Sequence, residues 1–341
     1  MRSNGAGIGY AGQREGGPYY DDLSVGQVFD WAPVLTLSSG LAAAHQAIVG
    51  DRLRLALDAG LCAAVTGLPA PLVHPGLVCD VAIGQSTLVT QRVKANLFYR
   101  GLTFHRFPVT GDSLYTRTEV VALRQNSLKP GRAPTGMAAL RMITIDQADQ
   151  VVLDFYRCAM LPASPDWRPD EGHPGDDLSA IGADVPGLAA DPTAQWDGAV
   201  FRSRVPGPHF DTGMAGAVLR STGDVVSGAP ELARLTLNIA ATHHDRRVGG
   251  RRLVYGGHTI GLALAQAARL LPNLVTVLGW RSCDHTGPVH EGDTLYSELR
   301  VESAERTGHG GVLGLRSLVY AAGDAEPDRP VLDWRFDALH F

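Results

Sequence analysis

Apolar and polar residues alternate with a period of two in six stretches of the chain. This pattern predicts strands of an antiparallel sheet that has one buried face. Two weaker runs, at 27–37 and 217–221, predict a short first strand in each half of the chain. The six stronger runs cover residues 114–123, 138–145, 151–160, 295–301, 312–320 and 331–341.

Two other stretches, 75–90 and 256–271, are apolar on nearly every side of a helical wheel. A helix of this kind is buried on all sides rather than half-exposed to solvent. Each stretch precedes three of the strong strand runs. The order predicts an α+β fold in which one long buried helix is wrapped by an antiparallel sheet, and this unit occurs twice.

The chain repeats itself. Residues 105–115 return as 285–296, an offset of 285 − 105 = 180 that becomes 181 after one inserted residue. Segment 73–76 matches 254–257 at an offset of 257 − 76 = 181, and 152–155 matches 331–334 at an offset of 179. Several matches that occur in the same order and at nearly the same offset indicate a tandem duplication.

The duplication defines the expected domain organisation. We expect an N-terminal unit at 17–162, a linker rich in proline, glycine and aspartate at 163–206, and a C-terminal unit at 207–341. Residues 1–16 are expected to form a flexible tail. The Gly-x-Gly-x-x-Gly pattern at 7–12 has no strand before it and no helix after it, so it does not predict a dinucleotide site.

Composition excludes several classes of protein. Apolar residues make up 45% of the 341 positions and charged residues 19%, which permits a sizeable core. The net charge of −5 argues against a general nucleic-acid binder. The most apolar stretch, 260–280, is interrupted by Gln266, Arg269 and Pro272, so no membrane span is expected. Four scattered cysteines and the lack of a secretory signal at the start favour a cytoplasmic location.

Two motifs are better explained by structure than by chemistry. Residues 111–114 spell Gly-Asp-Ser-Leu, but the repeat carries Thr294 at the serine position, so a turn is the simpler interpretation. The histidines of the second half do not have the spacing of known metal ligands, and no metal is expected. His285 is matched by His105, which suggests a role in the fold.

Residues found in only one copy are the better candidates for chemistry. The second copy has Asn238 and His243 ahead of Arg-Arg-Leu-Val-Tyr-Gly-Gly-His at 251–258. This run resembles the segment that precedes the central helix in MaoC-like (R)-specific enoyl-CoA hydratases. It is more similar still to the methylmalyl-CoA dehydratase (mesaconyl-CoA hydratase) branch, as is 95–101 in copy one, and the whole chain resembles mycobacterial double-hotdog proteins.

The resemblance implies a double-hotdog fold and places His243 on the family's catalytic histidine. Asn238 falls where the hydratases have a catalytic aspartate, because 243 − 238 = 5 matches their spacing. In copy one the acid remains as Asp51, but Ala56 replaces the histidine. We therefore expect the N-terminal unit to lack a catalytic site and the C-terminal unit to contain one.

The chemistry of the reaction suggests a role for each residue of that site. Adding water to an unsaturated thioester needs a base, and His243 suits that role. The reaction also needs hydrogen-bond donors for the enolate oxygen. The N–H groups of Gly256 and Gly257, at the start of a helix, suit this second role. Tyr255 and His258 are equally consistent with lining the pocket and with packing. Four arginines are candidates for coenzyme A phosphates, although a solvated surface explains them as well: Arg246, Arg247, Arg251 and Arg252.

The sequence therefore predicts reversible hydration or dehydration of an enoyl or 3-hydroxyacyl thioester of coenzyme A or acyl-carrier protein. No cofactor is expected beyond the thioester carrier. A pseudo-hydratase that binds an acyl thioester or a partner without turnover remains an alternative, as does a thioesterase. The protein is expected to be a monomer, since the two copies form a pseudo-dimer, or a homodimer.

Overall fold

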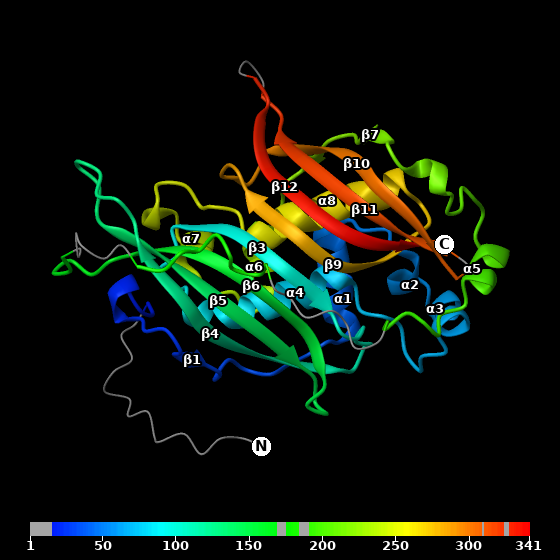
Figure 1. Ribbon diagram of the computed structural model, residues 1–341, viewed down its shortest axis with the longest axis horizontal. Helices are drawn as coiled ribbons and strands as arrows, with labels where there is room; N and C mark the ends of the chain where they lie inside the picture. Colours follow the sequence, from blue (N-terminus) through cyan, green and yellow to red (C-terminus); the bar gives the residue numbers. More distant parts are fainter. Residues whose placement is uncertain (1–15, 169–174, 184–190, 309, 324–326) are drawn as a thin grey trace.

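The computed structural model describes residues 16–168, 175–183, 191–308, 310–323 and 327–341. The glycine pattern at 7–12 and nearly all of the predicted tail lie outside these residues. Strands form one antiparallel sheet that curves around the central helices (Figure 1). The α+β prediction is confirmed.

The N-terminal unit follows the predicted order. Its helices are α1 (Ser39–Val49), α2 (Arg54–Leu57), α3 (Ala59–Thr66) and the central α4 (Pro75–Gln85), which a 3-10 turn at Ser86–Leu88 extends. Its strands are β1 (Val28–Phe29), β2 (Leu35–Thr36), β3 (Ala95–Phe104), β4 (Ser113–Gln125), β5 (Thr135–Ile145) and β6 (Val151–Pro162).

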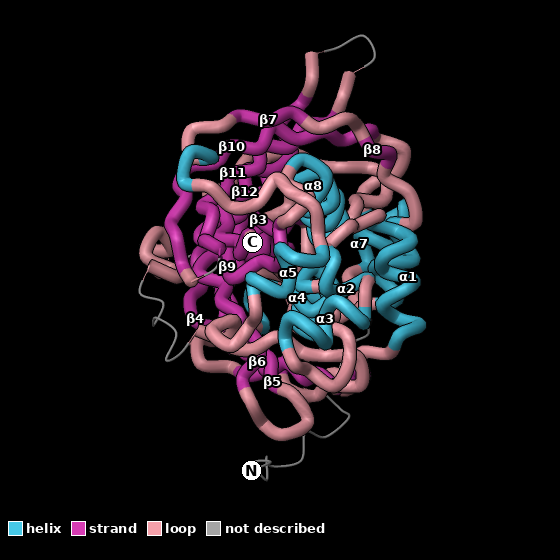
Figure 2. Tube along the Cα trace, turned by 90° about the vertical axis from the view of Figure 1, so that its right-hand side faces the viewer, coloured by secondary structure: helices cyan, strands magenta, loops and turns pink. Residues whose placement is uncertain are grey.

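The C-terminal unit repeats this order. Its helices are α6 (Ala229–Leu235), α7 (Ala241–His244) and the central α8 (Gly256–Leu270). Its strands are β7 (Val218–Arg220), β8 (Asp224–Val225), β9 (Leu274–His285), β10 (Thr294–Thr307), β11 (Gly310–Ala321) and β12 (Arg329–His340). Figure 2 shows the helices gathered on one side of the sheet that the strands form.

Strands β3 and β9 join the two units. They pair antiparallel, with Tyr99 opposite Cys283, and the order β1-β4-β5-β6-β3-β9-β12-β11-β10-β7 makes one continuous sheet. Neither strand was predicted. The first four residues of β9 are all buried, so the sequence there has no alternation to reveal a strand.

Equivalent hydrogen bonds confirm the duplication in three dimensions. The side chain of Gln85 donates to the carbonyl oxygen of Leu114 at 2.8 Å, and that of Gln266 donates to the carbonyl oxygen of Leu295 at 2.9 Å. Both pairs are related by the same offset, because 266 − 85 = 295 − 114 = 181. Each glutamine ties its central helix to the sheet, so the repeat register holds to the end of the helix.

The segment predicted as a linker contains α5 (Gly198–Arg204). The N–H of Asp197 donates to the carbonyl oxygen of Val65 in α3 at 2.7 Å, and Phe201 is completely buried. This part of the segment therefore adds to the core. Among the helices in the described residues, none has the length and apolar character needed to cross a membrane.

Candidate active site

A cavity of about 270 Å³ lies between the two units. The first unit contributes the end of α4, the start of β3 and one residue of β6. The second contributes the segment around α7, the start of α8 and the end of β9. Residues with polar groups in its wall include Thr87, Thr90, Lys94, Asn96, Arg157, Asn238, His243, Tyr255 and His285.

The His243 ring is held by a hydrogen bond through one of its two nitrogens, and no described residue binds the other. Its Nδ1 donates a hydrogen bond to the carbonyl oxygen of Leu253 at 2.8 Å, which leaves the lone pair on Nε2. Burial lowers the pKa of His243 to about 4, and the nearby Arg157 charge acts in the same direction. The imidazole is therefore neutral at pH 7 and able to accept a proton.

Asn238 lines the same cavity and is 2% exposed. Its Oδ1 accepts a hydrogen bond from the N–H of Ala240 at 3.0 Å, so Nδ2 is the group left to meet a ligand. His244 fixes the segment by donating from Nε2 to the Asn238 carbonyl oxygen at 2.7 Å. Leu237, the preceding residue, has a φ of 61°, a strained value for a residue with a side chain. The segment is thus held in one unusual conformation at the cavity.

The helix start at Gly256 offers a backbone donor. No described residue accepts a hydrogen bond from the N–H of Gly256 or Gly257, as is usual for the first amides of a helix. Gly256 lines the cavity, whereas Gly257 packs on the side that faces Asp80. A Cβ at Gly256 would lie 2.6 Å from Cε1 of His285, so any larger residue there would have to displace that ring. Gly256 is therefore the better oxyanion donor of the two.

The remaining predicted site residues separate into two groups. Tyr255 lines the cavity, and its ring lies edge-on to that of His243 at 5.8 Å between centroids. His258 does not line it and is fully buried on the other side of α8, where burial and the charge of His45 lower its pKa to about 4. The structure thus brings together Asn238, His243, Tyr255 and Gly256.

The four predicted phosphate-binding arginines lie outside the cavity wall. Arg246, Arg247, Arg251 and Arg252 occupy the exposed segment between His243 and Leu253. Arg247 pairs with Asp245 at 2.6 Å, and Arg252 pairs with Glu291 at 3.2 Å. Their contact with coenzyme A remains a prediction.

Among the cavity residues that were not assigned to the site from the sequence, four have a basic or amide side chain: Lys94, Asn96, Arg157 and His285. His285 was attributed to the fold because both copies carry the histidine, yet it lines the cavity, and its Nε2 has no partner among the described residues. Both polar side-chain atoms of Asn96 are buried without a partner among the described residues. Lys94 is exposed, and Arg157 is buried. The sequence could have pointed to Arg157, because the second copy has an apolar residue at the equivalent position.

The equivalent position in the first unit has a different arrangement. Asp51, which replaces Asn238, contacts His74 with 2.7 Å between Oδ2 and Nε2. Both residues are buried, and Ala56 provides no imidazole. The first unit therefore keeps the carboxylate that the second unit lacks, but this carboxylate is already paired with His74.

The chain is similar to proteins that act on coenzyme A thioesters. It is 29% identical over 343 residues to β-methylmalyl-CoA dehydratase from Chloroflexus aurantiacus, covering 94% of this chain and 91% of that protein. It is 26% identical over 322 residues to mesaconyl-CoA hydratase from Cereibacter sphaeroides, covering 89% of each. No family model matches the chain.

Two solved structures share the fold. A MaoC domain protein from Chloroflexus aurantiacus superposes with a TM-score of 0.77 at 26% identity, covering 95% of this chain and 97% of that one. Rv0216 from Mycobacterium tuberculosis, which has a double hotdog fold, superposes with a TM-score of 0.94 at 79% identity, covering 96% of this chain and all of that one. The chain therefore belongs to the MaoC-like double-hotdog family, together with Rv0216.

Proposed function

We propose that the protein is a hydratase/dehydratase that adds water reversibly across the double bond of an enoyl thioester. The observation that carries this proposal is the setting of His243, which lines the cavity, whose Nδ1 is fixed by Leu253 and whose Nε2 has no hydrogen-bond partner among the described residues. The relatives named dehydratase and hydratase support the same reaction class.

The cavity provides each part of the reaction. Nε2 of His243 takes a proton from water, whose oxygen bonds to the β-carbon of the enoyl group. The π electrons shift towards the thioester carbonyl, and the N–H of Gly256 stabilises the resulting enolate oxygen. The imidazolium then returns a proton to the α-carbon. Nδ2 of Asn238 donates to the water oxygen and orients it, and the reverse sequence dehydrates a 3-hydroxyacyl thioester.

We propose coenzyme A as the carrier, with no further cofactor, and a cytoplasmic location. The names of the relatives support coenzyme A. The four cysteines are free, which agrees with a reducing compartment. Because residues of both units line the cavity, a single chain holds a whole site and can work as a monomer.

The test follows loss of the enoyl absorbance on mixing the protein with short linear and methyl-branched enoyl-CoAs. We expect turnover by the wild type and a loss of about 10²–10⁴-fold in kcat for His243→Ala, the usual contribution of a general base. His209→Ala is the control, because that half-buried histidine does not line the cavity. Equal inertness of the wild type and His243→Ala across the panel would overturn the proposal.

A further inference from the structure

The start of α8 offers the cavity one backbone donor for the oxygen of a thioester. Gly256 lines the cavity, whereas Gly257 packs on the side that faces Asp80. Negative charge that develops on a carbonyl oxygen is stabilised by preorganised donors, which can be backbone N–H groups or side chains such as histidine. A second donor at this point of the cavity would therefore come from a side chain that lies beside Gly256.

The ring of His285 lies directly against Gly256. The three heavy atoms nearest to a Cβ built at Gly256 all belong to this ring, and Nε2 would be 2.7 Å from that Cβ. His285 is the last residue of β9, and it lines the same cavity as Gly256. The imidazole therefore packs on the Cα of Gly256, one covalent bond away from the backbone donor.

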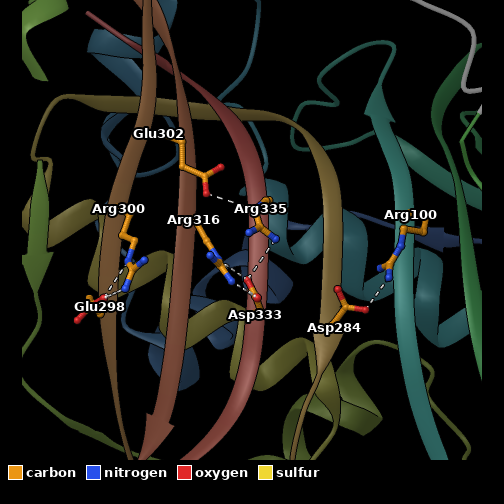
Figure 3. Close-up of polar contacts among 8 residues, drawn as sticks. All are labelled: Arg100, Asp284, Glu298, Arg300, Glu302, Arg316, Asp333 and Arg335. Atoms are coloured by element: carbon orange, nitrogen blue, oxygen red, sulfur yellow. Dashed lines mark hydrogen bonds and ion pairs between the residues drawn. The ribbon is translucent and has the colours of Figure 1, made fainter. Parts of the chain in front are cut away.

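The sheet directs this ring towards the helices. Asp284, the preceding residue, pairs with Arg100 at 2.6 Å on the face of the sheet that points away from the central helices (Figure 3). Successive side chains of a strand point to opposite faces, so His285 points towards the helices. The ring of Tyr99, from the neighbouring strand β3, lies edge-on to it at 5.9 Å between centroids. The imidazole is thus held over the start of α8.

The hydrogen-bonding capacity of this ring is not used within the protein. Nε2 of His285 is buried and has no partner among the described residues. Burial lowers the pKa of His285 to about 4, so the ring is neutral at pH 7 and carries one N–H group. A buried polar group without a partner costs free energy. An acceptor atom of a ligand would remove this cost.

The equivalent histidine of the first unit has no such neighbour. His105 matches His285, and Pro75 matches Gly256, at offsets of 285 − 105 = 180 and 256 − 75 = 181. A proline has no N–H to donate, and His105 does not line the cavity. The histidine occurs in both units, but only the second unit combines it with a backbone donor and a cavity.

We propose that His285 is a catalytic residue whose neutral imidazole donates a hydrogen bond from Nε2 to the carbonyl oxygen of the thioester. Together with the N–H of Gly256, it forms a site with two donors for the enolate oxygen. His285 keeps its proton throughout, and its hydrogen bond strengthens as the enolate forms and weakens when His243 protonates the α-carbon. This role deepens the proposed function and rests on it.

The first test does not depend on turnover. Butyryl-CoA labelled with ¹³C at the thioester carbonyl has no double bond to hydrate, so infrared difference spectroscopy can observe its complex with the protein. Hydrogen bonds to the carbonyl oxygen weaken the C=O bond and lower its stretching frequency. We expect a lower frequency on the wild type than in water, and a smaller shift on His285→Phe.

Three results of this measurement would count against the account. A wild-type frequency equal to that in water would overturn the role of His285. A full shift that persists in His285→Phe would overturn it as well. The absence of any band from bound butyryl-CoA would contradict both the donor role and the proposed function.

Two variants separate hydrogen bonding from packing and from proton transfer. His285→Phe keeps an aromatic ring against Gly256 and removes the donor, whereas His285→Gln keeps an N–H donor but cannot act as a base. We expect kcat for a short enoyl-CoA to fall about 10²–10³-fold in His285→Phe. His285→Gln should keep at least about tenfold more activity than His285→Phe, the value of one hydrogen bond. Equal losses in the two variants would overturn the donor role.

His105→Phe is the matched control. It makes the same change at the equivalent position of the first unit, outside the cavity wall. It should retain the wild-type kcat and the wild-type carbonyl frequency. A loss equal to that of His285→Phe would assign the effect to packing of the histidine and overturn the proposal.

The two proposals fail in different ways. A carbonyl shift that depends on His285, without hydration of any enoyl-CoA, supports the hydrogen bond and contradicts the hydratase. Hydration that depends on His243 and is unaffected by His285→Phe supports the hydratase and overturns the role of His285.

Discussion

Nδ1 of His243 donates a hydrogen bond to the carbonyl oxygen of Leu253 across 2.8 Å. This contact fixes the tautomer and keeps Nε2 unprotonated in a cavity that also contains the start of α8. Leu253 follows the exposed arginine segment directly, so that segment positions the base even though its side chains lie outside the cavity wall.

The pH dependence of kcat/KM should reveal this base. Burial lowers the pKa of His243 to about 4, and only the neutral ring can accept a proton. Hydration should therefore stay constant from pH 8 to about pH 5 and fall as the pH drops through 4. Arg157→Gln should move this limb to higher pH, because it removes a charge that disfavours the imidazolium. A wild-type limb at the ordinary histidine value near 6.5 would contradict this environment for His243.

Gly256→Pro should reveal the contribution of the backbone donor. Pro75 opens α4 at the position matching Gly256, so a proline is compatible with this helix start. Proline removes the N–H, whereas Gly256→Ala keeps it and introduces the same Cβ contact with His285. We expect kcat of the proline variant to lie about 10²–10³-fold below that of the alanine variant. Equal kcat values in single-turnover measurements would show that Gly256 does not stabilise the oxyanion.

The two lysines of the chain form a matched pair for testing contact with coenzyme A. Lys94 lines the cavity and is exposed, while Lys129 is exposed in the connection between β4 and β5. Lys94→Ala should raise KM for an enoyl-CoA about threefold to tenfold at low salt, with kcat unchanged. The effect should vanish with the pantetheine thioester, which lacks the nucleotide phosphates. Lys129→Ala should leave both KM values unchanged, and a rise equal to that of Lys94→Ala would contradict the assignment.

Buried histidines should make stability depend on pH. The pKa of His258 is lowered to about 4, so between pH 4 and 6.5 the unfolded chain binds the proton more readily than the folded one. Stability is therefore lost as the pH falls through this window, by about 2 kcal/mol at pH 5 for this residue. His258→Leu installs the residue of the repeat, Leu77, and should reduce the drop in Tm between pH 7 and pH 5 in thermal melts. An unchanged drop would show that His258 does not contribute to it.

Most of the fold could be predicted because periodicity and duplication carry the information. Alternation along β5 and β6 reflects one buried face, and α4 and α8 are apolar on all sides because both are enclosed. Strand β9 could not be predicted in this way. Its start is buried on both faces, so the sequence shows a continuous apolar run without a period.

The site was predictable where one copy differed from the other. His243 and Asn238 stood out because copy one lacks that pair, and the structure places both in the cavity. Arg157 differs from its repeat partner in the same way, but its register depends on matching β6 with β12. His285 gave no signal, because both copies carry the histidine and only the three-dimensional arrangement brings one of them to the cavity.

Labelled water shows directly whether the protein adds water to the double bond with His243 as the base. The protein is mixed with an enoyl-CoA in H₂¹⁸O, and the intact thioester is analysed by mass spectrometry. We expect one ¹⁸O atom on the β-carbon of the acyl group with the wild type and little or none with His243→Ala. Label found in a released carboxylic acid with free thiol, or equal labelling of the thioester by both proteins, would contradict it.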